Sequence, residues 1–102
     1  MALFQVQLGT STTTIFDPSE DSAVTTLFLC NTHSAAITVT LYLINGGGTP
    51  DDTNAIWKDI SIASKDTFVM NNERIILAAA DFIKGLASTA SKITVTGTYT
   101  TI

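Results

Sequence analysis

Threonine alternates with apolar side chains along several segments of this chain, and this pattern constrains the fold more than any other feature. Eighteen of the 102 residues are threonine. Residues 93–100 read Ile-Thr-Val-Thr-Gly-Thr-Tyr-Thr, and residues 37–43 read Ile-Thr-Val-Thr-Leu-Tyr-Leu. Side chains of a β-strand point alternately to the two faces of a sheet, so each segment has one apolar face and one face of hydroxyls. Threonine is also β-branched and suits an extended backbone. The pattern predicts a small all-β protein.

Other short apolar runs, separated by turn residues, extend this prediction. We expect strands at residues 3–8, 24–31, 37–45, 55–62, 67–70 and 93–100, with 37–45 as the longest. About seven to nine strands at spacings of about 8–12 residues are typical of an antiparallel β-sandwich, either jelly-roll or immunoglobulin-like. We expect one domain over residues 1–102, in which residues 1–8 form an extended N-terminal arm or an edge strand.

Two of these strands carry a more specific expectation. The run 24–31 is apolar on both faces, which predicts a central strand covered on both sides. It contains Cys30, which we expect to be a small buried apolar residue because no base lies near it in the sequence. In residues 55–62, strict alternation places Ile56, Ile60 and Ile62 on one face of the strand and Trp57 on the other.

The segment 75–88 allows two readings. A helix is possible over residues 72–84, with Asn72 as its N-cap and three consecutive alanines that favour it. The alternative is a strand at 75–77, a turn around Asp81 and a second strand at 82–87. Gly85 and the flanking turn residues favour the two strands.

Charge is scarce. The formal net charge is −4, and 14% of the residues are charged, against about a quarter in average domains. The five basic residues are scattered: Lys58, Lys65, Arg74, Lys84 and Lys92. Nucleic-acid binding needs clustered basic residues, so we expect none. No stretch approaches the roughly eighteen apolar residues of a membrane span, and we expect neither membrane insertion nor a cleaved signal peptide. So little charge indicates a polar uncharged surface, part of it buried against other chains.

Residues able to perform chemistry are few. His33 is the only histidine, so a serine nucleophile would have a single candidate base, and no G-x-S-x-G motif surrounds any serine. Cys30 precedes His33 by three residues, but a zinc site needs three or four ligands. Gly46, Gly47 and Gly48 do not form a phosphate loop, because no Gly-Lys-Thr follows. We expect no enzyme, no cofactor and no metal.

The loop 46–54 and the aromatic residues leave alternatives open. Asp51 and Asp52 lie on this glycine-rich loop and could bind calcium, although the EF-hand spacing is absent and simple solvation is the more ordinary reading. Trp57, Tyr42 and Tyr99 could stack on a sugar. Aromatic residues on strands more often belong to the core or to a protein interface.

One segment resembles a known group of proteins. Residues 28–43 read Phe-Leu-Cys-Asn-Thr-His-Ser-Ala-Ala-Ile-Thr-Val-Thr-Leu-Tyr-Leu. This hairpin is similar to one in small virion structural proteins of tailed bacteriophages. The similarity extends over residues 24–100 through the Lys58–Asp59 pair, the turn 63–66 and the segment 87–97. It implies a β-sandwich subunit of a virion, made in the host cytoplasm, and carries over no functional residue.

These observations lead to a functional hypothesis. We expect a capsid decoration or cement protein that contacts the major capsid protein and sister copies, as a homo-oligomer and preferably a trimer. The expected contacts are residues 2–7, the loop 46–54 and Trp57; the individual residues are Leu3, Phe4, Gly47, Asp51, Asp52 and Trp57. A tail, baseplate or fibre-associated subunit is the closest alternative. A host-surface module that binds a glycan or receptor through Asp51, Asp52 and Trp57 is the alternative of another class.

Overall fold

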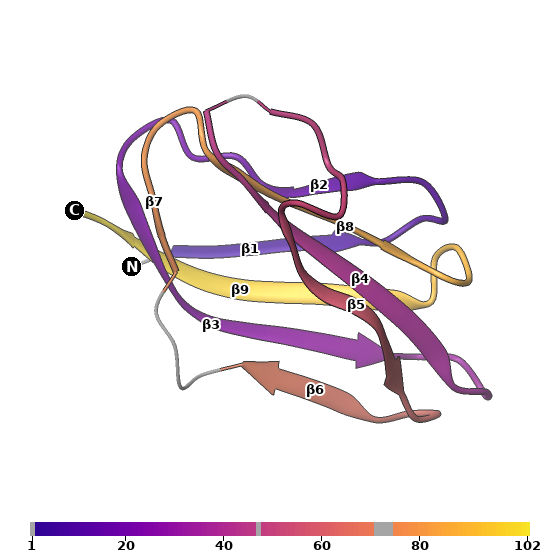
Figure 1. Cartoon of the computed structure of the whole chain (residues 1–102). Helices are drawn as coiled ribbons and strands as arrows, with labels where there is room; N and C mark the ends of the chain where they lie inside the picture. The colour runs from indigo at the N-terminus through magenta and orange to yellow at the C-terminus, as the bar shows by residue number, and fades with distance from the viewer. Residues whose placement is uncertain (1, 47, 71–74) are drawn as a thin grey trace.

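The computed structural model describes residues 2–46, 48–70 and 75–102, which form nine antiparallel strands in two sheets (Figure 1). The strands are β1 (Ala2–Gln7), β2 (Thr13–Phe16), β3 (Ser22–Asn31), β4 (Ile37–Ile44), β5 (Ala55–Ile62), β6 (Thr67–Met70), β7 (Ile75–Leu77), β8 (Phe82–Ala87) and β9 (Ile93–Thr101). The predicted all-β sandwich is confirmed. No helix in the described ranges is long and apolar enough to span a membrane.

The strands pair from the two ends of the chain inward. β1 pairs with β9, β2 with β8, β3 with both β6 and β7, and β4 with β5. In this nested pairing, the first strand pairs with the last, the second with the next to last, and so on. Two further pairs, β3 with β9 and β4 with β8, join the strands into two sheets. One sheet has five strands, in the order β1-β9-β3-β6 with β7 also paired to β3, and the other has four, in the order β2-β8-β4-β5. A nested ladder wrapped into two sheets is the jelly roll. The topology therefore decides between the two sandwich types that the sequence left open.

The core lies between the two sheets, where the alternation in the sequence places it. In β9, Ile93 and Val95 are fully buried, whereas the intervening Thr94 and Thr96 remain partly exposed. The largest buried side chains come from both sheets: Leu8, Leu27, Leu29, Ile37, Leu41, Ile44, Ile83 and Ile93. Removing apolar surface from water at this interface is the main force that holds the sandwich together.

The central strand differs in two ways from what the sequence indicated. β3, with 10 residues, is longer than β4, which has 8, so the expectation that residues 37–45 form the longest strand is wrong. β3 is central within its sheet, but along residues 26–30 it is covered on one face only. Leu27 and Leu29 are fully buried, Phe28 between them is 38% exposed, and Cys30 is partly exposed. No second layer of described residues covers the outer face, so a continuous apolar run does not imply two covered faces.

The segment 75–88 forms the strands β7 and β8, as the favoured reading predicted. The turn between them is closed by a hydrogen bond from the Asp81 N–H to the Ala78 carbonyl, 3.0 Å. Gly85 lies in the middle of β8. A Cβ there would approach the Thr40 carbonyl oxygen to 3.1 Å and Ile15 to 2.9 Å, so close strand packing requires glycine. Asn72, the proposed cap of the alternative helix, lies outside the described residues.

A bulge in β5 reverses the expected orientation of Trp57. Val39 faces Ile60, and Leu41 faces Trp57, so two steps along β4 correspond to three along β5. The extra residue is accommodated near Asp59, whose φ of 53° is left-handed. Trp57 therefore packs against the core on the same side as Ile62, while Ile56 is 40% exposed. The prediction that Ile56 and Ile62 share a face opposite Trp57 is wrong, because one inserted residue inverts the alternation.

Replacing Thr40 with valine is expected to lower the free energy of unfolding by about 1–2 kcal/mol. The buried Thr40 hydroxyl makes two hydrogen bonds to Asp59, the residue at the bulge. It accepts a hydrogen bond from the Asp59 N–H, 3.1 Å, and donates one to the Asp59 carboxylate, 3.3 Å. Urea unfolding measures the effect, and Thr38→Val on the same strand is the control. Equal effects of the two substitutions would show that the hydroxyl does not support the bulge.

Candidate functional site

Among the residues that the structure describes, the outer face of the five-stranded sheet carries only uncharged side chains. In the paired registers, three rows cross the sheet: Leu3, Thr98 and Thr26; then Gln5, Thr96, Phe28 and Val69; then Gln7, Thr94, Cys30 and Thr67. A further row contains Thr100, Ala23 and Ile76. We call these fourteen residues the threonine face. The strands that carry it lie side by side in Figure 1.

Apolar side chains are exposed on this face. Leu3 is 61% exposed, Phe28 38%, Val69 44% and Ile76 68%. Phe28 and Val69 are directly opposed on neighbouring strands. Glutamine amides of β1 connect this strand to β9; the Gln5 amide donates a hydrogen bond to the Thr96 hydroxyl at 3.2 Å. The face therefore combines exposed apolar groups with short hydroxyls and amides that are already ordered.

The charged side chains of the described residues lie elsewhere. They occupy the connections between strands or stand on β5 and β8: Asp17, Glu20, Asp21, Asp51, Asp52, Lys58, Asp59, Lys65, Asp66, Asp81, Lys84 and Lys92. Burying a charge in an interface is costly, and the centres of protein interfaces are depleted in charged residues. This separation makes the threonine face the part of the surface best suited to being covered by another protein.

Phe4, one of the expected contact residues, points into the sandwich. Its ring stacks on Phe16 with centroids 4.7 Å apart, and Phe16 contacts Tyr99 at 4.7 Å on a tilted plane. Phe4 and Phe16 come from β1 and β2, the edge strands on this side of the two sheets. The three rings close this open side of the sandwich. Leu3, the neighbouring expected contact, has the opposite orientation and belongs to the threonine face.

Trp57 closes the opposite open side of the sandwich. Its ring meets Phe68 of β6 edge-on, with centroids 4.8 Å apart. β5 and β6 are edge strands of different sheets, so this pair closes the second open side. Trp57 also packs against the core cluster. An inward ring offers less of its surface to a sugar or a protein partner than the sequence suggested.

The two carboxylates of the loop 46–54 bond to groups within the loop or on the adjacent strand β5. The Asp51 carboxylate accepts hydrogen bonds from the hydroxyl and the N–H of Thr53, and these bonds hold the pKa of Asp51 below its ordinary value. Asp52 forms an ion pair with Lys58 at 2.8 Å, which raises the pKa of Lys58 through the hydrogen bond and the opposite charge. The two carboxylates thus have separate partners. Gly47, another expected contact, lies outside the described residues.

Within residues 2–46, 48–70 and 75–102, no three histidine, cysteine or acidic side chains gather closely enough to hold a metal ion. Cys30 is on the threonine face. The His33 backbone is held in the next turn by the Asn31 side chain, which accepts a hydrogen bond from the His33 N–H at 2.9 Å.

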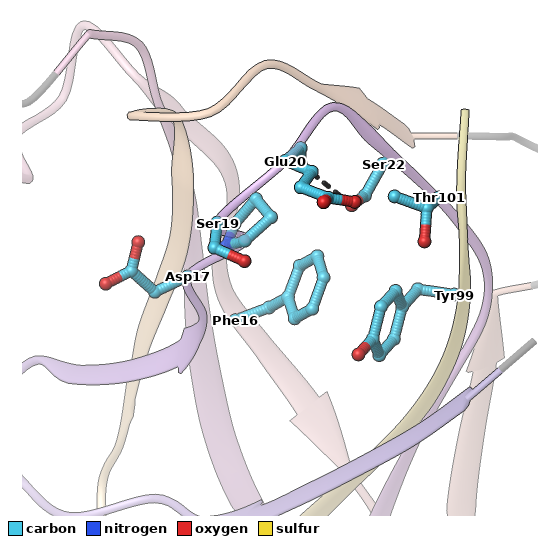
Figure 2. Close-up of a pocket in the computed structure, with 8 residues that line it drawn as sticks. Phe16, Asp17, Ser19, Glu20, Ser22, Tyr99 and Thr101 are labelled. Carbon is cyan, nitrogen blue, oxygen red and sulfur yellow. Dashed lines mark hydrogen bonds between the residues drawn. The ribbon is translucent and has the colours of Figure 1, made fainter.

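A hollow of about 300 Å³ lies between the turn after β2 and the end of β9 (Figure 2). Its lining residues are Phe16, Asp17, Pro18, Ser19, Glu20, Ser22, Tyr99 and Thr101. The Ser22 hydroxyl already donates to the Glu20 carbonyl at 2.9 Å. Phe16 is only 8% exposed and contacts the rings of Phe4 and Tyr99, so it offers little surface on which a sugar could stack.

Sequence reasoning named Leu3 but missed the rest of the threonine face. The alternation in residues 93–100 gave a signal, since it places one row of hydroxyls on a single face. The reading of residues 24–31 as doubly covered hid Phe28, because exposure of one face depends on what the other elements cover.

Comparisons with known proteins add little. No protein-family model matches the chain, and no curated protein matches it. Among solved structures, the chain is similar to one from the structure of infectious bursal disease virus Gx strain, with 18% sequence identity and a TM-score of 0.47. The match covers 95% of this chain and 28% of that chain. A likeness of this degree carries no argument about function.

Proposed function

We propose that this chain is a non-enzymatic structural subunit of a tailed-phage virion, and that it acts as a capsid decoration protein. The observation that carries the proposal is the threonine face, a broad uncharged sheet surface with four exposed apolar side chains. The resemblance of residues 24–100 to small phage virion proteins supplies the virion context. Jelly rolls also serve in viral capsids and in lectins, so the fold is compatible with this role without assigning it.

The attachment would use the threonine face rather than the contacts first expected. Phe4 and Trp57 close the sandwich, whereas Phe28 and Val69 are exposed at one end of a four-residue row of the face. Covering these side chains removes apolar surface from water, and the surrounding hydroxyls can pair with the major capsid protein at little desolvation cost. Weak contacts of this kind become strong when symmetry repeats them over a capsid lattice.

The test is binding to phage heads that lack the protein, followed by electron microscopy. Wild-type protein is expected to add ordered density to the capsid lattice. Phe28→Glu is expected to weaken head binding roughly tenfold or more, because it places a charge within the interface. Ile56→Glu is the matched control, since Ile56 is apolar and 40% exposed against 38% for Phe28 but lies on the other sheet. Its binding should equal that of wild type.

Other outcomes decide against the proposal. Bare heads, with density on tails or baseplates, would establish the tail-associated subunit. Bare virions with binding to host cells or to a glycan panel would establish the host-surface module. Loss of head binding in Ile56→Glu but not in Phe28→Glu would show that the four-stranded sheet, rather than the threonine face, contacts the shell.

A further inference from the structure

The edge strands of the two sheets are not equally protected against pairing with another chain. β5 contains Lys58 and Asp59 and is bulged, and β2 has four residues with a register shift between Thr14 and Phe16. β6 and β7 have four and three residues. Short length, charge and bulges are the features by which edge strands avoid unwanted pairing. β1 has six residues, no charge, no proline and an unbroken register with β9.

The backbone groups on the free edge of β1 can be assigned. The Leu8 N–H donates to the Ile93 carbonyl at 3.0 Å, so this pair is hydrogen-bonded. In an antiparallel ladder, hydrogen-bonded and non-hydrogen-bonded pairs alternate. Ala2, Phe4 and Val6 therefore direct their N–H and C=O groups to β9. The N–H and C=O groups of Leu3, Gln5 and Gln7 point away from β9, and in the described part of the chain β9 is the only strand that pairs with β1.

We propose that β1 pairs with β1 of a second copy of this chain, antiparallel and across a two-fold axis at Gln5, so that two five-stranded sheets form one continuous sheet. Each Leu3 would face Gln7 of the second copy, and the two Gln5 residues would face each other. Every such pair exchanges two backbone hydrogen bonds. This inference concerns the free chain and does not depend on the proposed function.

The chemistry of β1 favours a second copy as the partner. Pairing across a two-fold axis places the central residue opposite itself, and a charge there would meet its like. Gln5 is neutral, and its amide can both donate and accept. The side chains of Leu3, Gln5 and Gln7 also belong to the threonine face, so the join extends this face without a charged boundary. Leu3, 61% exposed, would gain a neighbour in the second copy.

Molar mass in solution tests the proposal, by size exclusion with light scattering. The wild type is expected at twice the chain mass of 10.8 kDa. Gln5→Pro removes an N–H that points away from β9, so it should leave the fold intact, as judged by circular dichroism, and yield a monomer. Val69→Pro is the matched control. The Asn31 N–H bonds to the Asp66 carbonyl at 2.9 Å, so by the same alternation the Val69 N–H points outward at the opposite edge of this sheet. This variant should remain dimeric.

A charge exchange tests the register. Gln5→Lys and Gln5→Glu are each expected to be monomeric, because residue 5 would face the same charge in its partner. An equimolar mixture is expected to restore the dimer. A monomeric wild type, a dimeric Gln5→Pro variant or a mixture that stays monomeric would each overturn the proposal. The capsid-binding experiment would be unaffected by any of these results.

Discussion

Replacing Asn31 with alanine is expected to lower the free energy of unfolding by about 3 kcal/mol. Asn31 ends β3 and is completely buried. The two N–H groups of its amide are shared among three carbonyls, those of Ala35 and Ile62 at 3.0 Å and that of Ala63 at 3.2 Å. Its oxygen accepts a hydrogen bond from the His33 N–H at 2.9 Å. The side chain thereby connects the end of the five-stranded sheet to the last residue of β5 in the other sheet. Its loss leaves several backbone groups without partners at this corner.

Chemical denaturation of the purified protein measures this effect. Asn54→Ala is the matched control, since the Asn54 side chain also bonds to backbone groups, at 2.8 Å and 3.0 Å, but does so within an exposed loop. Water can replace those bonds, so we expect a change below about 1 kcal/mol. Similar small effects of both substitutions would show that the buried amide does not hold the corner between the sheets.

Replacing Gly97 with alanine is expected to destabilise the fold by about 2 kcal/mol, because it displaces the Phe4 ring. Gly97 and Phe4 are directly opposed on β9 and β1. A Cβ on residue 97 would lie 2.2 Å from the nearest ring carbon of Phe4. The ring covers the glycine and is held by its stack on Phe16, an arrangement known as aromatic rescue of a strand glycine. The added methyl group therefore disrupts the aromatic closure between β1 and β2.

A double-mutant cycle with Phe4→Ala isolates this interaction. Phe4→Ala alone should also cost about 2 kcal/mol, since a partly buried ring is removed. In that background Gly97→Ala should be neutral or slightly stabilising, because the clash is absent and alanine is better than glycine in a strand. Strictly additive effects, measured by denaturant unfolding of the four proteins, would contradict the role of the ring.

The contact residues expected from the sequence agree only in part with the threonine face. The sequence indicated low charge, little chemistry and contact residues at Leu3, Phe4 and Trp57. Leu3 does lie on the outer face. Phe4 and Trp57 are aromatic residues on strands, and their hydrophobicity alone does not tell whether they fill the sandwich or anchor a partner. The residues with the strongest claim to an interface, Phe28 and Val69, became visible only when the exposed side of the sheet was known.

Local patterns in the sequence determined the all-β class, most strand positions and the turn in the segment 75–88, because side-chain alternation and turn residues act over a few neighbouring positions. Only the tertiary structure decided the jelly-roll order of the strands, since β1 and β9 meet across almost the whole chain and no local pattern encodes their pairing. It also decided the orientation of Trp57, because the bulge near Asp59 inverts the alternation in β5. The burial of Asn31 also depends on tertiary structure, because its partners Ile62 and Ala63 are distant in sequence and are brought near by the packing of the two sheets.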